Sequence, residues 1–227
     1  MPMKTRTKFI IAFVAGILGL SAVLVFSEPP SGASPEDAKI SQLQNVKFNP
    51  RELQSGDLVF RNGDSFMSDR IVALSPEGVK LSHVGIIIRE ENRLYVVHII
   101  GDHFKNYVRK DSLKSFVENS VPEHLCVTRY SGSNQTRLAI AETALNYFRE
   151  RRGFDYDMTL ESEDELFCTE LAWRAVLDAT GKDVSPEKVP WRGKILIGFM
   201  PFFRGPHFEP VYLEKKCPVF QKSAAIN

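Results

Sequence analysis

The stretch Ser82-His-Val-Gly-Ile-Ile-Ile-Arg-Glu-Glu-Asn-Arg-Leu-Tyr-Val-Val-His-Ile-Ile100 predicts a β-hairpin. Two runs rich in Val and Ile, 82–89 and 94–100, lie on either side of a polar segment, as in two strands joined by a loop. A two- or four-residue loop centred between residues 91 and 92 places His98 opposite Gly85. His83 and His98 then project from one face of the sheet as diagonal neighbours. A loop of odd length would separate them.

A second segment, Glu165-Leu-Phe-Cys-Thr-Glu-Leu-Ala-Trp173, places Cys168 at or just inside the start of a predicted helix. Apolar residues recur at helical spacing from Leu171 to Ala179, and Gly181 is a helix terminator. The unpaired N–H groups of a helix N-terminus and a nearby imidazolium both stabilise a thiolate, the reactive form of cysteine. Cys168 is therefore a candidate nucleophile. The alternative is an inert cysteine on an apolar helix face.

Thiol catalysis requires three groups: a nucleophile, a base that takes its proton, and a third group that fixes the tautomer of the base. The predicted hairpin allows His83 to be the general base and His98 to be the orienting third residue, with Cys168 delivered by a helix packed on that face. Gly85, opposite His98, leaves space for a substrate or a ring, or it marks close packing. The same three side chains could instead bind Zn²⁺, because Cys and His are its preferred ligands.

The composition indicates one well-cored domain. The chain has 227 residues, of which 43% are hydrophobic and 25% charged. A formal net charge of +1, with no basic run after the first eight residues, argues against nucleic acid as a partner. The sequence contains no phosphate-binding glycine loop. If Cys168 is a catalytic nucleophile, we expect neither a cofactor nor a resident metal.

The N-terminus predicts an export signal or a membrane anchor. Lys4, Arg6 and Lys8 precede the uncharged stretch Phe9–Phe26, which is longer than the usual core of a signal peptide and near the minimum length that spans a bilayer. Both interpretations of residues 1–27 stay open, and residues 28–44 form a polar tether. The catalytic domain, residues 45–227, is then extracytoplasmic, either secreted or membrane-anchored through the N-terminal segment, in the periplasm or at the cell surface.

Three cysteines leave at least one thiol unpaired in an oxidising compartment. A disulfide between Cys126 and Cys217, with Cys168 free, is the arrangement consistent with catalysis.

Other segments predict the remainder of the domain. Residues 58–60 and 126–130 are candidate strands, and Ser133 or Asn134 can cap a helix that runs to residue 152. The apolar positions expected on the core face of that helix are Leu138, Ala141, Leu145 and Phe148. The late apolar run 195–203 is expected to form a strand and a loop that cover the core.

These motifs carry a family resemblance. The runs are Ser55-Gly-Asp-Leu-Val-Phe60, Ser82-His-Val-Gly-Ile86, Val96-Val-His98, Phe154-Asp155 and Leu166-Phe-Cys-Thr-Glu-Leu171. Between about residues 53 and 173 the chain resembles the permuted papain-like amidases, the YaeF/YiiX group of NlpC-type cysteine hydrolases, which are related to lecithin:retinol acyltransferase-like enzymes. The resemblance implies an α+β fold, circularly permuted and papain-like, with an antiparallel sheet against which the nucleophile helix packs. It also implies that Cys168 is the nucleophile, His83 the base and His98 the third residue, a position where such enzymes also use Glu.

Two features depart from the family pattern. Family members tend to show Tyr-Asp where this chain has Phe154-Asp155, and Tyr156 comes two residues later. A tyrosine donor of the oxyanion hole would therefore be Tyr156, and the alternative donor is the backbone N–H of Cys168, which needs no side chain. Four carboxylates between Glu161 and Glu165 precede the nucleophile and would raise its pKa if they faced it. We expect them on a solvated loop.

The leading functional hypothesis is an extracytoplasmic thiol hydrolase that cleaves amide bonds, including those of cell-wall peptides, through a thioester. An acyl-lipid hydrolase or lipid acyltransferase with the same thiol is the second hypothesis. The third is a protein without catalytic activity, either a zinc-binding module or an inactive member of the fold.

Overall fold

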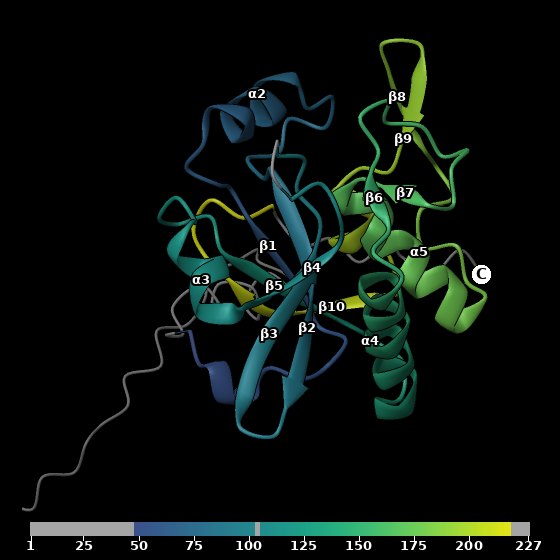
Figure 1. Cartoon of the computed structure of the whole chain (residues 1–227). Coiled ribbons are helices and arrows are strands. Elements are labelled where there is room, and N and C mark those ends of the chain that lie inside the picture. The colour runs from purple at the N-terminus through teal and green to yellow at the C-terminus, as the bar shows by residue number, and fades with distance from the viewer. Residues whose placement is uncertain (1–47, 103–104, 219–227) are drawn as a thin grey trace, which may run out of the picture. The chain divides into compact units, whose positions relative to one another are not determined.

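The computed structural model describes residues 48–102 and 105–218 (Figure 1). The chain divides into two units, Met1–Ala33 and Ser34–Asn227, and the described residues belong to the second. The predicted signal or anchor and the tether lie outside the described residues. Within the described ranges, no helix is both long enough and apolar enough to cross a membrane.

A six-stranded sheet in which every neighbouring pair is antiparallel forms the centre of the domain, in the order β10-β5-β1-β2-β3-β4. Its strands are β1 (Leu58–Arg61), β2 (His83–Glu90), β3 (Arg93–His98), β4 (Arg109–Ser112), β5 (Cys126–Tyr130) and β10 (Phe208–Leu213). Two small sheets pair β6 (Gly153–Phe154) with β7 (Glu165–Leu166) and β8 (Val189–Trp191) with β9 (Lys194–Leu196). The predicted α+β class with an antiparallel sheet is confirmed.

Helices cover both faces of this sheet (Figure 1). The helical elements are η1 (Pro50–Glu52), α2 (Phe66–Leu74), α3 (Leu113–Glu118), α4 (Asn134–Arg149), α5 (Cys168–Thr180) and η2 (Met200–Phe202). One core cluster joins Val84 and Ile86 to residues of α4 and α5. A smaller cluster on the other face joins Val59, Ile87 and Val96 to Leu113 and Phe116 of α3. Because side chains alternate along a strand, each β2 residue belongs to one face or the other.

The predicted hairpin is confirmed in its register. β2 pairs with β3 so that Glu90 lies opposite Arg93 and Gly85 lies opposite His98. The connection is a two-residue turn, and Glu91 adopts the left-handed conformation with φ of 52°. Tight hairpin turns require positive φ, so the polar residues 91 and 92 suit this position.

Helix α4 begins where it was predicted, since the Ser133 side chain accepts a hydrogen bond from the N–H of Thr136. It ends at Arg149 rather than at residue 152, and Arg151 has a positive φ of 56°. The predicted core face was wrong in part, because Leu138 is 50% exposed. The buried residues of α4 are Ile140, Ala141, Ala144 and Tyr147.

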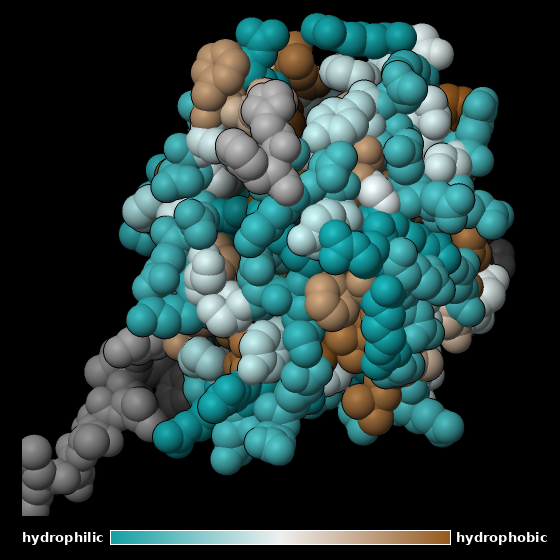
Figure 2. Space-filling view, in the orientation of Figure 1, coloured by the Kyte–Doolittle hydropathy of each residue, from teal (hydrophilic) through white to brown (hydrophobic). Residues whose placement is uncertain are grey.

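The segment between β1 and β2 carries the exposed helix α2. None of its residues is buried, and its exposed large apolar side chains are Phe66, Met67, Ile71 and Leu74. Figure 2 shows tan and brown surface at the top of the view, where Figure 1 places α2. The late apolar run behaves as predicted, because Ile197, Phe199, Phe202 and Phe203 are buried in the larger core cluster.

The predicted disulfide between Cys126 and Cys217 is present, and Cys168 is the free cysteine. The bond joins the start of β5 to the segment that follows β10, which pairs with β5.

Candidate active site

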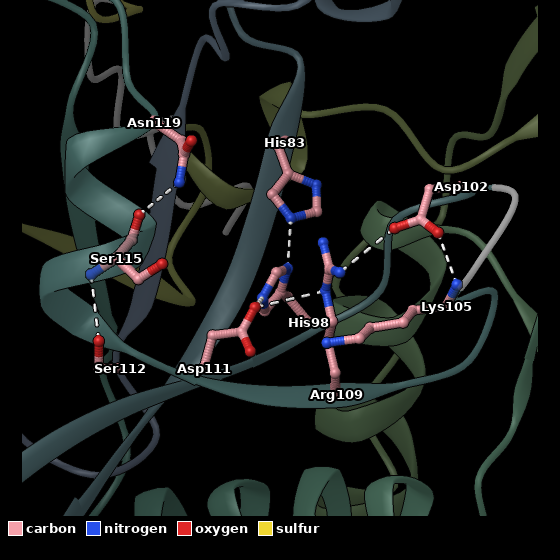
Figure 3. A network of polar contacts seen from close by, with 9 residues as sticks. All are labelled: His83, His98, Asp102, Lys105, Arg109, Asp111, Ser112, Ser115 and Asn119. Atoms are coloured by element: carbon pink, nitrogen blue, oxygen red, sulfur yellow. Dashed lines mark hydrogen bonds and ion pairs between the residues drawn. The ribbon is translucent and has the colours of Figure 1, made fainter.

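The hairpin brings the two predicted histidines into direct contact. His83 Nε2 lies 2.8 Å from His98 Nδ1, and both side chains are buried (Figure 3). Gly85 makes this approach possible by close packing. A Cβ at that position would lie 2.3 Å from Val96 Cγ1 and 3.0 Å from His98 Cβ. Of the two interpretations of Gly85, close packing is the one that the structure supports.

Asp111 extends the pair into a chain of three side chains. His98 Nε2 lies 3.0 Å from Asp111 Oδ2, and Asp111 comes from β4, which pairs with β3 (Figure 3). Asp111 was not among the residues predicted from the sequence. The segment Arg109-Lys-Asp-Ser112 is short and polar, with no apolar alternation to mark a strand.

The carboxylate of Asp111 fixes the tautomers of both imidazoles. An ionised carboxylate only accepts hydrogen bonds, so His98 carries its proton on Nε2 and its Nδ1 is an acceptor. His83 must then donate from Nε2 to His98. This leaves His83 Nδ1 as the unprotonated nitrogen that can take a proton from another group.

Burial keeps both imidazoles neutral. Desolvation lowers the pKa of His83 well below its usual value, and the neighbouring His98 and two arginines lower it further. Desolvation also lowers the pKa of His98, although the hydrogen bond to Asp111 opposes this shift. The same hydrogen bond lowers the pKa of Asp111. The resting chain therefore consists of an ionised carboxylate and two neutral rings.

Two further residues hold this chain in place. The Phe116 ring of α3 lies 5.5 Å from the His83 ring and 5.4 Å from the His98 ring, measured between centroids. Arg109 lies with its Nε 3.4 Å from the Asp111 carboxylate and its Nη1 3.4 Å from the Asp102 carboxylate (Figure 3). Phe116 excludes water from the rings, and Arg109 restrains the carboxylate that orients them.

Cys168 occupies the first position of α5, as predicted, and its side chain is half-buried. The first hydrogen bond within the helix runs from the N–H of Leu171 to the carbonyl of Phe167. The N–H groups of Cys168 and Thr169 precede that bond and have no partner within the helix. The Cys168 N–H is thus free to donate to an oxyanion formed beside the sulfur.

The expected placement of α5 on the face of the histidines is wrong. Helix α5 packs on the face of Val84 and Ile86, whereas His83 and His98 contact Phe116 on the other face. The start of β2 lies near the start of α5, because the N–H of Val84, the residue after His83, acts on the Cys168 sulfur. No hydrogen bond among the described residues joins Cys168 to His83, but the backbone N–H of Val84 lies close enough to the sulfur to lower its pKa.

The thiol of Cys168 is neutral at rest, contrary to the thiolate expected from its helix position. Burial raises its pKa to about 11, and this effect exceeds the opposing influence of the N–H groups of Val84, Thr169 and Cys168 itself. Because His83 is neutral as well, the two groups do not form a resting ion pair. A neutral pair of this kind acts by general base catalysis, in which the proton leaves sulfur as the sulfur attacks.

The Tyr156 side chain is 62% exposed, and its hydroxyl donates to the carbonyl of Asp102 at 3.2 Å. That contact gives no support to Tyr156 as an oxyanion donor. The carboxylates that precede the nucleophile are solvated as predicted, since Glu161, Glu163, Asp164 and Glu165 are all exposed.

The described residues contain no group of three or more His, Cys, Asp or Glu side chains arranged to hold a metal ion. His98 has both ring nitrogens engaged, one with His83 and the other with Asp111. It therefore cannot supply the third ligand of the zinc site considered from the sequence.

A comparison with protein families matches residues 52–189 to the permuted papain-like amidase enzymes, YaeF/YiiX, of the C92 peptidase family. The match covers the described chain from η1 to the first residue of β8. This chain belongs to the permuted papain-like amidase family.

Relatives agree with this assignment. The chain is 25% identical over 152 residues to the uncharacterized protein YiiX of Escherichia coli strain K12, covering 66% of this chain and 70% of that protein. A crystal structure described as metalloprotein YiiX from Escherichia coli O157:H7 superposes with a TM-score of 0.60 at 20% identity, covering 71% of this chain and 97% of that one. The structural match supports the permuted papain-like fold.

Proposed function

We propose that this member of the family is a cysteine hydrolase that cleaves amide bonds through a thioester on Cys168. The single observation that carries the proposal is the hydrogen-bonded chain from Asp111 through His98 to His83. The N–H of Val84, the residue after His83, is close enough to the sulfur of Cys168 to lower its pKa. This chain leaves His83 Nδ1 as an unprotonated base, a role that no packing requirement explains.

The proposed reaction has two steps. Cys168 Sγ attacks the carbonyl carbon while its proton passes to His83 Nδ1, and the N–H of Cys168 donates to the oxyanion. The imidazolium then returns the proton to the leaving amine, and water hydrolyses the thioester. General base catalysis requires heavy atoms about 2.6–3.2 Å apart, so the Cys168 side chain rotates toward His83 Nδ1 when substrate binds, while the His83 ring keeps its hydrogen bond to His98.

We also propose that the domain acts outside the cytoplasm, on peptide amides such as those of a cell wall. The Cys126–Cys217 disulfide supports an oxidising compartment, and the basic and apolar N-terminal sequence supports export or anchoring. The disulfide state in cell fractions tests this point: a reduced pair in freshly quenched cells would contradict it.

Hydrolysis or transfer of acyl lipids is a second candidate function, because α2 exposes several large apolar side chains and lies between β1 and β2, the strand that begins with His83. These side chains are Phe66, Met67, Ile71 and Leu74. Exposed apolar groups of this kind can contact acyl chains. The test compares peptidyl p-nitroanilides with p-nitrophenyl esters of short and long acyl chains, in the wild type and in Cys168→Ala. Amide turnover lost in Cys168→Ala supports the amidase, whereas turnover confined to long-chain esters supports the lipid enzyme.

A further inference from the structure

Arg61 carries a buried positive charge beside the histidine chain. It is the last residue of β1, lies directly opposite His83 in the sheet, and is only 7% exposed. Its guanidinium carbon lies 4.8 Å from the centroid of the Phe116 ring, the same ring that packs on His83 and His98. Arg61, His83 and His98 thus all contact the same aromatic ring.

The charge of Arg61 has no carboxylate partner among the described residues. Its Nη1 donates to the backbone carbonyl of Asn119, and its buried Nε has no hydrogen-bond partner among those residues. Asp64 and Asp111 influence its pKa from a distance, but neither forms an ion pair with it. Arg109, by contrast, is paired with both Asp102 and Asp111.

An unpaired buried guanidinium destabilises a fold, because charges lose hydration when they are buried. Such groups are normally paired, and an exception calls for an explanation in function. The guanidinium is also close enough to Cys168 to lower the pKa of the thiol. Its position therefore places a positive charge, with an Nε–H donor that has no partner among the described residues, near the proposed nucleophile.

We propose that Arg61 binds an anionic group of the substrate, a carboxylate or a phosphate close to the carbonyl that Cys168 attacks. This inference rests on the proposed function and narrows its substrate class to acyl compounds that carry a negative charge near the scissile bond. The planar guanidinium fork suits both anions, and the low exposure strengthens the interaction.

The experiment compares two alkylating reagents of similar size, iodoacetate and iodoacetamide. In both, the sulfur of Cys168 displaces iodide from a methylene carbon, but only iodoacetate is an anion. The rate with iodoacetamide reports the reactivity of the thiol, and the ratio of the two rates reports anion recognition. Free cysteine provides the reference ratio.

We expect the wild type to favour iodoacetate, relative to free cysteine, by about tenfold or more, the effect of one charge-assisted hydrogen bond. Arg61→Met should abolish this preference, Arg61→Lys should retain part of it, and Arg70→Gln, which removes an exposed charge from α2, should leave it unchanged. If Arg61→Met slows both reagents equally, Arg61 acts only on the thiolate, and the proposal is overturned.

A second measurement separates this proposal from the proposed function. Phosphate and acetate, each at constant ionic strength against chloride, should raise the melting temperature of the wild type and of Cys168→Ala but not of Arg61→Met. The anion with the larger shift identifies the preferred group. An inert thiol with this stabilisation intact would refute only the hydrolase, whereas equal stabilisation of wild type and Arg61→Met would refute the anion site.

Discussion

His83 Nε2 lies 2.8 Å from His98 Nδ1, and the two buried rings meet at 72° and pack against the ring of Phe116. Because His98 donates its single N–H, on Nε2, to Asp111, its Nδ1 accepts from His83 Nε2, and this sets the direction of both hydrogen bonds in the chain. Asp111 therefore fixes the tautomer of the proposed base, His83, through His98.

Asp111→Asn tests this direction. The amide can donate to His98 Nε2, which favours the wrong tautomer of His98 and then of His83. We expect kcat to fall by about 10²-fold, the low end of what a general base contributes, with KM little changed. Asp102→Asn is the matched control, because Asp102 pairs with Arg109, whereas Asp111 pairs with both Arg109 and His98. Equal losses in the two variants would show that the carboxylates act only through Arg109.

The pH dependence of thiol labelling tests the neutral resting pair. With a Cys168 pKa of about 11, the rate of iodoacetamide labelling should rise steadily from pH 6 to pH 9, since the thiolate fraction grows with pH throughout that range. Mass spectrometry of peptides locates the adduct. A plateau that begins below pH 8 would instead indicate a thiolate and imidazolium pair.

The two buried histidines should make the fold less stable in mild acid. Their folded-state pKa values are lowered, so below pH 6.5 the unfolded chain binds protons that the folded chain does not. Each imidazole then lowers the free energy of unfolding by about 1.4 kcal/mol per pH unit until its folded pKa is reached. Above about pH 6.5 both states bind the same number of protons at these residues, so the free energy of unfolding is no longer reduced.

Urea unfolding of the wild type between pH 7.5 and 5 measures that slope. The double variant His83→Gln/His98→Gln should show a shallower slope, with every other titrating group unchanged. If the free energy of unfolding changes with pH equally in the two proteins, the pKa values of His83 and His98 are not lowered in the folded state.

Gly85→Ala should disturb both stability and the site. The added Cβ would lie 2.3 Å from Val96 Cγ1 and 3.0 Å from His98 Cβ, so the hairpin must shift. Overpacking of this kind costs about 1–3 kcal/mol of unfolding free energy. Gly153→Ala is the control, because its Cβ would lie 3.3 Å from the flexible Glu165 side chain and 3.9 Å from the Asn106 carbonyl oxygen, the latter an ordinary contact. A Gly85→Ala protein with wild-type stability and labelling rate would show that close packing there is unnecessary.

The hairpin and the nucleophile helix could be predicted because their signals are local. Two runs rich in Val and Ile, joined by a polar loop of two or four residues centred between residues 91 and 92, predict the pairing of Gly85 with His98. Gly181 ends α5 in the left-handed conformation. The count of three cysteines indicated one free thiol, and the structure shows that the pair is the one consistent with catalysis, Cys126–Cys217.

Asp111, Phe116 and Arg61 could not be predicted because their roles depend on long-range pairing. Asp111 reaches His98 only through β4, and Arg61 faces His83 only through the β1 and β2 register. The face of α5 was also wrong, since a helix pattern gives the buried stripe but not the side of the sheet that it covers. The pKa of Cys168 followed burial rather than helix position.

The most direct test of the account is the capture of an acyl group on Cys168. The protein is mixed with p-nitrophenyl acetate, quenched in acid within the first turnover, and mapped by peptide mass spectrometry. The account predicts a burst of p-nitrophenol and an acetyl thioester on Cys168, absent in Cys168→Ala and formed at least about 10²-fold more slowly in His83→Ala. An acetyl group on other residues alone, or one that forms on Cys168 at the same rate without His83, would contradict it.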